Sequence, residues 1–205
     1  MKKRIALIGA SGHGKVIADI AYSNGFNDIV FYDDRWQEIG SLYGIKVVGD
    51  LAQAINDSKS FDAVYVSIGN NSIRARVQAQ LHNIGPALVH PSACVSASVK
   101  LGFGTVVMPK AVLNADTVVG NGVIVNTGAV IEHDCIIQDF SHICPQAAIA
   151  GGVKVGTQSW VGIGSSVIQL KTIGDFVTVG AGSVVIRDIP DGQTVAGSPA
   201  MLIKR

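Results

Sequence analysis

The chain has 205 residues, enough for one large domain or two small ones, and a net charge of +1 at pH 7. That charge argues against the strongly basic face of nucleic-acid-binding proteins, and no apolar run approaches the roughly 18 residues of a membrane span. The N-terminal apolar stretch is shorter than that of a signal peptide, and three cysteines without C-x-x-C spacing favour neither disulfides nor zinc, so we expect a cytoplasmic protein.

The first part of the chain alternates strand and helix patterns. Residues 4–8 form an apolar strand, and a helical pattern runs from Lys15 to Asn24. Further strands are predicted at 29–32 and 63–68, the second followed by a helix through Arg74. This alternation predicts an α/β domain with a small Rossmann-like parallel sheet, and we place it in residues 1–85.

The loop IGASGHGKV lies between the first strand and the first helix. It fits the dinucleotide pattern G-x-G-x-x-G at Gly9 and Gly14, but Ser11 stands at the second glycine, which argues against a dehydrogenase. It fails the P-loop pattern because Val16 replaces the hydroxyl residue that binds magnesium. A helix N-terminus favours an anion, and Asp33 at the next strand end could bind a ribose, so we expect a nucleotide-bearing substrate. The alternative is a tight turn that binds nothing.

The second part of the chain repeats with a strict period of six residues. Seventeen hexads, from Val89 to the hexad opening at Val185, all begin with Val, Ile or Leu. The fifth position is small in 15 of them, the exceptions being Lys171 and Ile189. A hexapeptide period is typical of a parallel β-helix in which three hexads make one triangular coil. We therefore expect a β-helix of five to six coils in residues 86–205.

His133 is the principal candidate for catalysis. It occupies the third position of its hexad, outside the packed interior, and lies between Glu132 and Asp134, either of which could orient its imidazole. Because one coil takes 18 residues, Gly151 should lie one coil beyond it, with an N–H suited to an oxyanion. Spacing alone also allows an ordinary surface histidine.

The remaining histidines and cysteines give weaker signals. Cys135 holds the small fifth position of a hexad, which favours a packed thiol over a nucleophile. His142 lies off the interior and could bind a ligand, although spacing slightly favours a solvated side chain, whereas His13 has no packing reason to be in the glycine loop and is expected to contact a ligand. A zinc enzyme would need three convergent histidines, and the β-helix offers His133 and His142 with His90 only at its first coil, so we expect no metal.

The motifs occur in an order that resembles a known family. GASGHG, Asp-Asp, IGNN with a following Arg, HPSA, the hexads with NTGAVIEHD and a closing GSPA are similar to sugar acetyltransferases of the sialic-acid O-acetyltransferase type. Within that type the chain most resembles the UDP-4-amino-sugar N-acetyltransferases of the bacillosamine pathway. The resemblance implies a left-handed β-helix, acetyl-CoA as co-substrate, and a homotrimer that holds coenzyme A between neighbouring β-helices.

The resemblance also implies roles for individual residues. His133 matches the general base, and Asn126 matches an asparagine near the acceptor amine. Asp134 matches an acid that is usually glutamate. This difference leaves open whether Asp134 or Glu132 orients the ring. Positions that match acetyl-CoA contacts are His142, Gly151, Gly162, Gly180 and Ala181. Positions that match the nucleotide-sugar pocket are Gly9, Ser11, Gly12, His13, Asp33, Asp34, Gly69, Asn70 and Asn71.

The expected activity is acetyl-CoA-dependent N-acetylation of a UDP-4-amino-4,6-dideoxy sugar, by direct transfer with a histidine base. One alternative is O-acetylation of sialic acid or a similar sugar, because the sequence does not decide between an amine and a hydroxyl acceptor. Another is N-acetylation of GDP-perosamine, because the nucleobase is not specified either. A β-helix that serves only as a scaffold or binding module is the non-enzymatic alternative.

Overall fold

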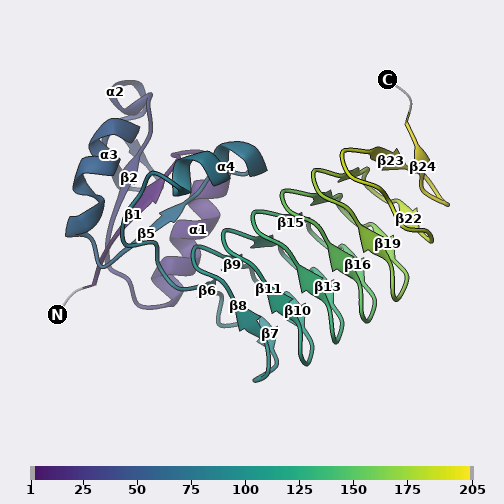
Figure 1. Ribbon diagram of the computed structural model, residues 1–205. Helices are drawn as coiled ribbons and strands as arrows, with labels where there is room; N and C mark the ends of the chain where they lie inside the picture. Colours follow the sequence, from purple (N-terminus) through teal and green to yellow (C-terminus); the bar gives the residue numbers. More distant parts are fainter. Residues whose placement is uncertain (1–2, 204–205) are drawn as a thin grey trace.

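The structure is a computed structural model that describes residues 3–203, with an α/β part at one end and a β-helix at the other (Figure 1). The helices are α1 (Gly12–Ser23), α2 (Trp36–Ile39), α3 (Leu51–Asp57), the 3-10 helix Ser58–Ser60 and α4 (Asn71–Gln78). The strands of the α/β part are β1 (Arg4–Ile8), β2 (Asp28–Tyr32), β3 (Ser41–Leu42), β4 (Ile45–Gly49) and β5 (Ala63–Val66). Within residues 3–203, no helix combines the length and apolar character that crossing a membrane requires.

The α/β sheet has the order β3-β4-β2-β1-β5 and is parallel except for the β3–β4 hairpin. Side chains alternate between its two faces, so Leu7 and Phe31 pack with α1 on one face while Ile8 and Val30 pack with α3 and α4 on the other. The parallel strands and α1 and α4 confirm the predicted α/β sheet. The α2–β3–β4–α3 segment was not predicted.

The β-helix consists of two- or three-residue strands stacked in three sheets, which we call sheets I, II and III. Sheet I contains β6 (Leu88–Val89), β9 (Val106–Val107), β12 (Ile124–Val125), β15 (His142–Ile143), β18 (Trp160–Val161), β21 (Thr178–Val179), β23 (Thr194–Ala196) and β24 (Met201–Leu202). Sheet II contains β7 (Cys94–Val95), β10 (Val112–Leu113), β13 (Val130–Ile131), β16 (Ala148–Ile149), β19 (Ser166–Val167) and β22 (Val184–Val185). Sheet III contains β8 (Lys100–Leu101), β11 (Val118–Val119), β14 (Ile136–Ile137), β17 (Lys154–Val155) and β20 (Thr172–Ile173).

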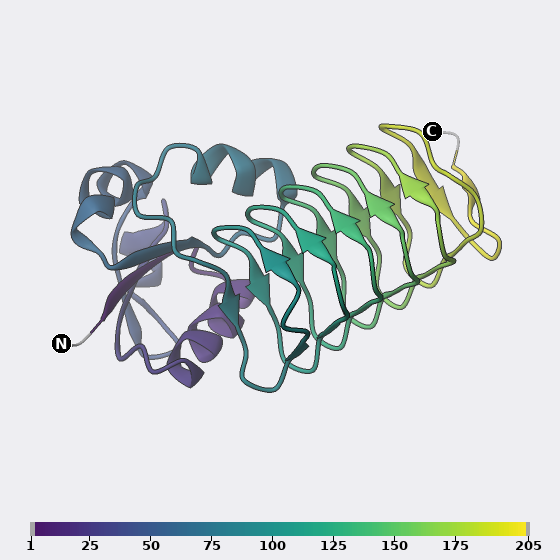
Figure 2. The same cartoon turned by 60° about the horizontal axis from the view of Figure 1, so that its bottom comes forward.

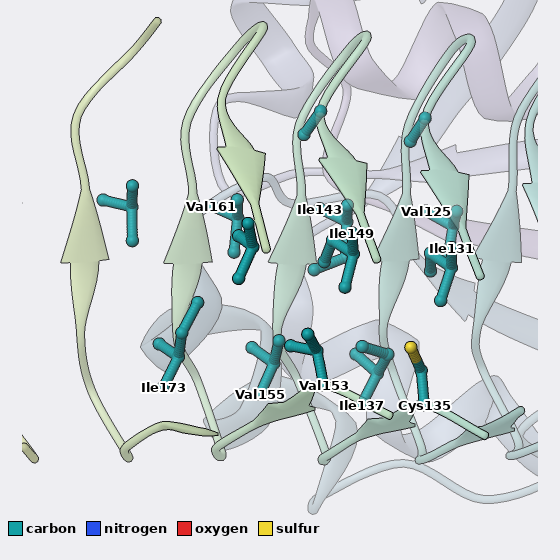
Figure 3. Close-up of a cluster of buried hydrophobic side chains, with 14 of the residues drawn as sticks. Val125, Ile131, Cys135, Ile137, Ile143, Ile149, Val153, Val155, Val161 and Ile173 are labelled. Carbon is teal, nitrogen blue, oxygen red and sulfur yellow. The ribbon is translucent and has the colours of Figure 1, made fainter. Parts of the chain in front are cut away.

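The interior is filled by the residues that open each hexad. Strands pair with a register of 18 residues, so Val125, Ile143 and Val161 form one column of fully buried side chains (Figure 3). Columns from the three sheets meet along the axis and form one continuous core. This confirms the predicted left-handed parallel β-helix of hexapeptide repeats.

The corners explain why the fifth position is small. Thr105, Ser141 and Ser159 each donate a side-chain hydrogen bond to the carbonyl oxygen 15 residues later, at 2.6–2.7 Å. A larger side chain at this position would displace that bond. The preceding fourth position has a positive φ in each corner from Gly104 to Gly182, whether or not it is a glycine. Each coil turns at three corners. We name them I/II, between sheets I and II, II/III, between sheets II and III, and III/I, where the chain returns to sheet I.

The last hexad departs from the regular period. β21 pairs with β23 at a register of Thr178 to Thr194, which is shorter than in the other coils, and Ile189 forms the bridge to Ile173. The chain then reverses into β24, which is antiparallel to β23. The irregular fifth-position residue Ile189 therefore belongs to a shortened final coil.

The α/β part meets the β-helix through two of its helices, which lie beside the coils in both views (Figure 1 and Figure 2). On the first coils, α1 covers the outward apolar side chains of sheet I, namely Leu88, Val106 and Ile124. Further along, α4 lies on the III/I corners through polar contacts of Asn71 and Arg74. This arrangement places the glycine loop and the loop before α4 next to sheet I.

Candidate functional site

His133 lies on the II/III corner between β13 and β14 and forms a close pair with its neighbour. Its Nδ1 is 2.7 Å from Asp134 Oδ2, and both side chains are more than half exposed. Because a carboxylate only accepts, Nδ1 donates and Nε2 keeps the free lone pair. The Asp134 hydrogen bond is the main reason that the pKa of His133 is raised, with a smaller contribution from the charge of Glu132.

The two acids beside His133 have different contacts. Asp134 occupies the corner position with a φ of 59° and contacts the ring. Glu132 is half-buried, and its Oε2 accepts a hydrogen bond of 2.9 Å from Asn114 Nδ2 in the preceding coil. The sequence left open which acid contacts the imidazole, and in the structure it is Asp134.

Gly151 lies where the coil period predicts, directly beside His133. A Cβ added at Gly151 would lie 2.6 Å from His133 Cε1 and 2.7 Å from Nε2. Any side chain there would therefore displace the imidazole. None of the backbone hydrogen bonds among residues 3–203 uses the Gly151 N–H, whereas the following residue, Gly152, donates to the His133 carbonyl at 2.9 Å. The corner thus offers one free basic nitrogen and one available backbone donor side by side.

A second group of polar side chains lies on sheet I, beneath the α/β part. His142 Nε2 is 2.9 Å from Asn126 Nδ2, and its ring packs edge-to-face on Trp160 with centroids 4.2 Å apart. His142 is only 5% exposed, so the prediction of a solvated side chain was wrong. The hexad pattern placed His142 outside the prism correctly, but the α/β part covers this stretch of the outer surface.

The histidines of this group are uncharged at neutral pH. Burial, followed by the charge of Arg74, lowers the pKa of His142 to about 3 and that of His13 to about 4. His13 Nε2 and His142 Nδ1 are both buried without a hydrogen-bond partner in the described part of the chain. Unpaired buried nitrogens are rare in folded proteins, which makes these two nitrogens candidates for contact with a ligand.

A pocket opens at the carboxyl ends of β1, β2 and β5, where parallel α/β sheets bind ligands. Gly9, Asp33 and Asp34, three of the nine residues predicted to contact the nucleotide-sugar, line it. Asp33 Oδ2 accepts the Ala10 N–H at 2.9 Å, which fixes the glycine loop to β2. The other eight residues that line the pocket were not predicted from the sequence. For three of them a signal was present, because Arg35 directly follows Asp-Asp and Ile73 and Arg76 follow IGNN.

The loop before α4 lies between this pocket and sheet I. Asn70 caps α4 by accepting the Ile73 N–H at 3.0 Å. Asn71 Nδ2 donates to the Gln158 carbonyl at 2.9 Å, so the Asn71 amide is occupied by the β-helix. Asn70 and Asn71 also line a cleft that Trp160 closes on the β-helix side. Gly69 lies in the same loop, and Ser11 and Gly12 are exposed at the start of α1.

Of the five predicted coenzyme contacts, three lie at the I/II corner, whereas Gly151 lies at the II/III corner and His142 lies in β15. Gly162 directly follows β18, and Gly180 and Ala181 follow β21. Asn126 occupies the equivalent position after β12, two coils before Gly162. A Cβ at Gly162 would lie 2.5 Å from the Val179 carbonyl oxygen, so packing between coils alone already requires a glycine. The II/III corner with His133 is a different edge of the prism. One chain therefore does not bring His133 and Gly151 together with Asn126, His142 and the I/II glycines.

Cys135 points into the prism and is fully buried. Its Sγ donates to the Ala150 carbonyl at 3.2 Å, and burial raises the pKa of the thiol, which is the opposite of what a nucleophile needs. Between residues 3 and 203, no cluster of three or more His, Cys, Asp or Glu side chains could hold a metal ion.

Comparisons with known proteins show which proteins this chain resembles. A family model described as the PglD N-terminal domain matches residues 4–81. The UDP-N-acetylbacillosamine N-acetyltransferase of Bacillus subtilis is 40% identical over 116 residues, 52% of this chain and 51% of that protein. The match thus spans about half the length of this curated relative.

Two solved structures align over nearly the whole chain. The acetyltransferase domain of PglB from Neisseria gonorrhoeae, in complex with acetyl coenzyme A, is 44% identical with a TM-score of 0.94, covering 99% of this chain and 100% of that one. PerB from Caulobacter crescentus, in complex with CoA and GDP-perosamine, is 36% identical with a TM-score of 0.90, covering 100% and 99% of the two chains.

Proposed function

Because the chain belongs to the family of acetyl-CoA-dependent sugar N-acetyltransferases that includes the PglB acetyltransferase domain, we propose that it acetylates the amine of a UDP-4-amino-4,6-dideoxy sugar. The observation that carries the chemistry is the His133–Asp134 pair, with Nε2 of the imidazole facing Gly151. The nucleotide belongs in the pocket of Asp33 and Asp34 at the end of the α/β sheet.

In the proposed reaction the sugar amine attacks the thioester carbonyl of acetyl-CoA directly. His133 Nε2 takes the proton from the attacking nitrogen, and the imidazolium is stabilised by its hydrogen bond to Asp134. The Gly151 N–H donates to the tetrahedral oxyanion. When the C–S bond breaks, the imidazolium gives its proton to the departing thiolate. No covalent enzyme intermediate is required.

We further propose that the complete site forms between two copies of a homotrimer. Within one chain, His133 and the Asn126–His142 group lie on different edges of the β-helix, so a neighbouring copy must supply one of them. Each of these two corners also exposes an apolar side chain: Ile163 on I/II is 56% exposed and Leu170 on II/III is 73% exposed. Contact between copies would bury both, with acetyl-CoA lying along the I/II glycines.

The choice of a UDP-linked acceptor rests on the relatives. The curated relative named for UDP-N-acetylbacillosamine and the PglB domain are 40% and 44% identical to this chain, whereas PerB, bound to GDP-perosamine, is 36% identical. GDP-perosamine remains the second candidate because PerB aligns over the full chain with both α/β and β-helix parts.

The experiment that tests the acceptor is acetyl-CoA turnover, followed by thiol release, against a panel of sugars. The panel contains a UDP-4-amino-4,6-dideoxy sugar, GDP-perosamine, and free and CMP-linked sialic acid. We expect turnover with the UDP-amino sugar. Turnover with GDP-perosamine alone would replace the nucleotide in the proposal, and turnover with sialic acid alone would replace N-acetylation by O-acetylation.

A further inference from the structure

Arg74 is a buried cation that has no carboxylate partner in the described part of the chain. It is 1% exposed, and none of the ion pairs within residues 3–203 includes it. Burial lowers its pKa to about 9, so the guanidinium is still charged at neutral pH. A buried charge is tolerated only where its donors are satisfied, and here backbone carbonyls and one amide oxygen satisfy them. The site described above does not account for this residue.

The hydrogen bonds of Arg74 tie the loop before α4 to the β-helix. On the loop side, Nη1 donates to the carbonyls of Ile68 and Gly69 at 3.1 and 3.0 Å. On the β-helix side, Nε donates to the Gly122 carbonyl and Nη2 to the Phe140 carbonyl, both at 2.7 Å. One planar group therefore holds one loop against two successive III/I corners.

The rest of α4 follows the same corners. Asn71, Arg74 and Gln78 occupy one face of the helix at spacings of three and four residues. Asn71 contacts the corner at Gln158, Arg74 those at Gly122 and Phe140, and the Gln78 amide abuts Gly104. A helical turn rises about 5.4 Å and coils stack about 4.8 Å apart, so successive turns of the helix meet successive coils. Among the three, only Arg74 also bonds to Ile68 and Gly69.

The loop that Arg74 holds carries residues of both binding regions. Ile68 lines the nucleotide pocket, and Asn70 and Asn71 line the cleft closed by Trp160. The charge of the guanidinium also contributes to the lowered pKa of both His13 and His142, after burial, which is the larger cause. Arg74 thus bonds both to the loop that lines these two regions and to the III/I corners of the β-helix.

We propose that Arg74 is a positioning residue for acetyl transfer: by fixing the Ile68–Asn71 loop to the III/I corners, it sets where the nucleotide-bound sugar meets the acetyl group. This inference rests on the proposed function. Arg74 touches neither reacting group, so its loss should leave both substrates bound but misaligned. A displacement of about 1 Å can lower a rate about 10²-fold.

The test compares Arg74→Met and Arg74→Lys with Gln78→Met. Gln78 is a matched control because it is buried on the same helix face but does not bond to the loop, and its Oε1 has no hydrogen-bond partner within residues 3–203. Lysine keeps the charge but lacks the planar fork that bonds to loop and corners together, and it carries the test if the methionine variant does not fold. For each folded variant we would measure kcat, the Kd of UDP and of acetyl-CoA, and the NMR titration of His142.

We expect both Arg74 variants to lose about 10²-fold in kcat with near-normal Kd values, while Gln78→Met keeps kcat. In Arg74→Met the pKa of His142 should rise but stay below 6.5, because burial is the larger cause. A role in folding alone would lower the folded fraction and leave kcat per folded molecule unchanged, which would overturn the proposal. An equal loss of kcat in Gln78→Met would also overturn it.

If the wild type acetylates no nucleotide-linked amino sugar, the proposed function fails and the positioning role is decided by hydrogen exchange. Faster exchange of the Gly69–Asn71 amides in the Arg74 variants than in Gln78→Met would support the proposal that Arg74 fixes this loop to the III/I corners. Equal exchange in all three variants would overturn it.

Discussion

At the scale of single residues, the protonation of His133 depends on one carboxylate. The hydrogen bond from Nδ1 to Asp134 favours the imidazolium, so the pKa lies above its ordinary value of 6.5. His133 is therefore a neutral base only above that raised pKa, and its contribution to turnover falls as the pH drops through it.

Asp134→Asn should move this transition to lower pH. An amide cannot stabilise the imidazolium as a carboxylate does, so the pKa of His133 should fall toward 6.5 and the maximal rate should decrease because the base is weaker. The measurement is the pH dependence of kcat/KM in both proteins. Titration of the acceptor amine is common to both, so only the difference reports His133. Coincident profiles would contradict the assignment of Asp134.

Gly151→Ala should lower kcat by displacing the imidazole. The new Cβ would lie 2.6–2.7 Å from the ring, so His133 must move while its own coil stays packed. We expect a loss of about 10²-fold in kcat and little change in the unfolding temperature. A crystal structure of the variant with an unmoved ring, or unchanged kcat, would exclude a catalytic role for this contact.

At the scale of structural elements, the hexad explains what could be predicted from the sequence. The opening residues of the hexads had to fill the prism, so the coils, the stacking of Gly151 on His133 and the inward thiol of Cys135 all followed from counting by six. The burial of His142 did not follow, because it depends on where a separate α/β part rests. The contacts of Arg74 with the III/I corners could not be predicted for the same reason.

Cys135→Ser tests the role of the fifth position. At the III/I corners, Ser141 and Ser159 donate a hydrogen bond equivalent to the one that Cys135 donates at its II/III corner. Serine therefore fits the Cys135 position without a new cavity. We expect the free energy of unfolding to change by less than about 1 kcal/mol and kcat to stay at the wild-type value. Loss of turnover in the folded serine variant would revive the nucleophile hypothesis.

At the scale of the whole molecule, the division of the site between two corners makes a prediction about mixed assemblies. His133→Ala disables the II/III corner, and Ala181→Trp should block the I/II corner where acetyl-CoA is proposed to lie. Each variant alone should be nearly inactive. When the two variants form cyclic trimers at equal ratio, an interface is active only if its I/II corner comes from the His133→Ala variant and its II/III corner from the Ala181→Trp variant. Random mixing makes about one quarter of the interfaces active, so about one quarter of wild-type activity should return.

The mixing is done by co-expression or by unfolding and refolding together. Failure to recover activity in trimers shown to contain both variants would place both halves of the site within one chain. A recovered fraction that depends on the ratio of the two variants would support a shared site.

The most direct test of the account as a whole is the turnover of His133→Ala with acetyl-CoA and the UDP-amino sugar, measured together with its affinity for acetyl-CoA. A positioned base contributes about 10² to 10⁴ in rate, so kcat should fall by that factor while the Kd of acetyl-CoA stays near normal. A fully active His133→Ala would contradict the account, because it would show that His133 is not the base that accepts the proton of the amine.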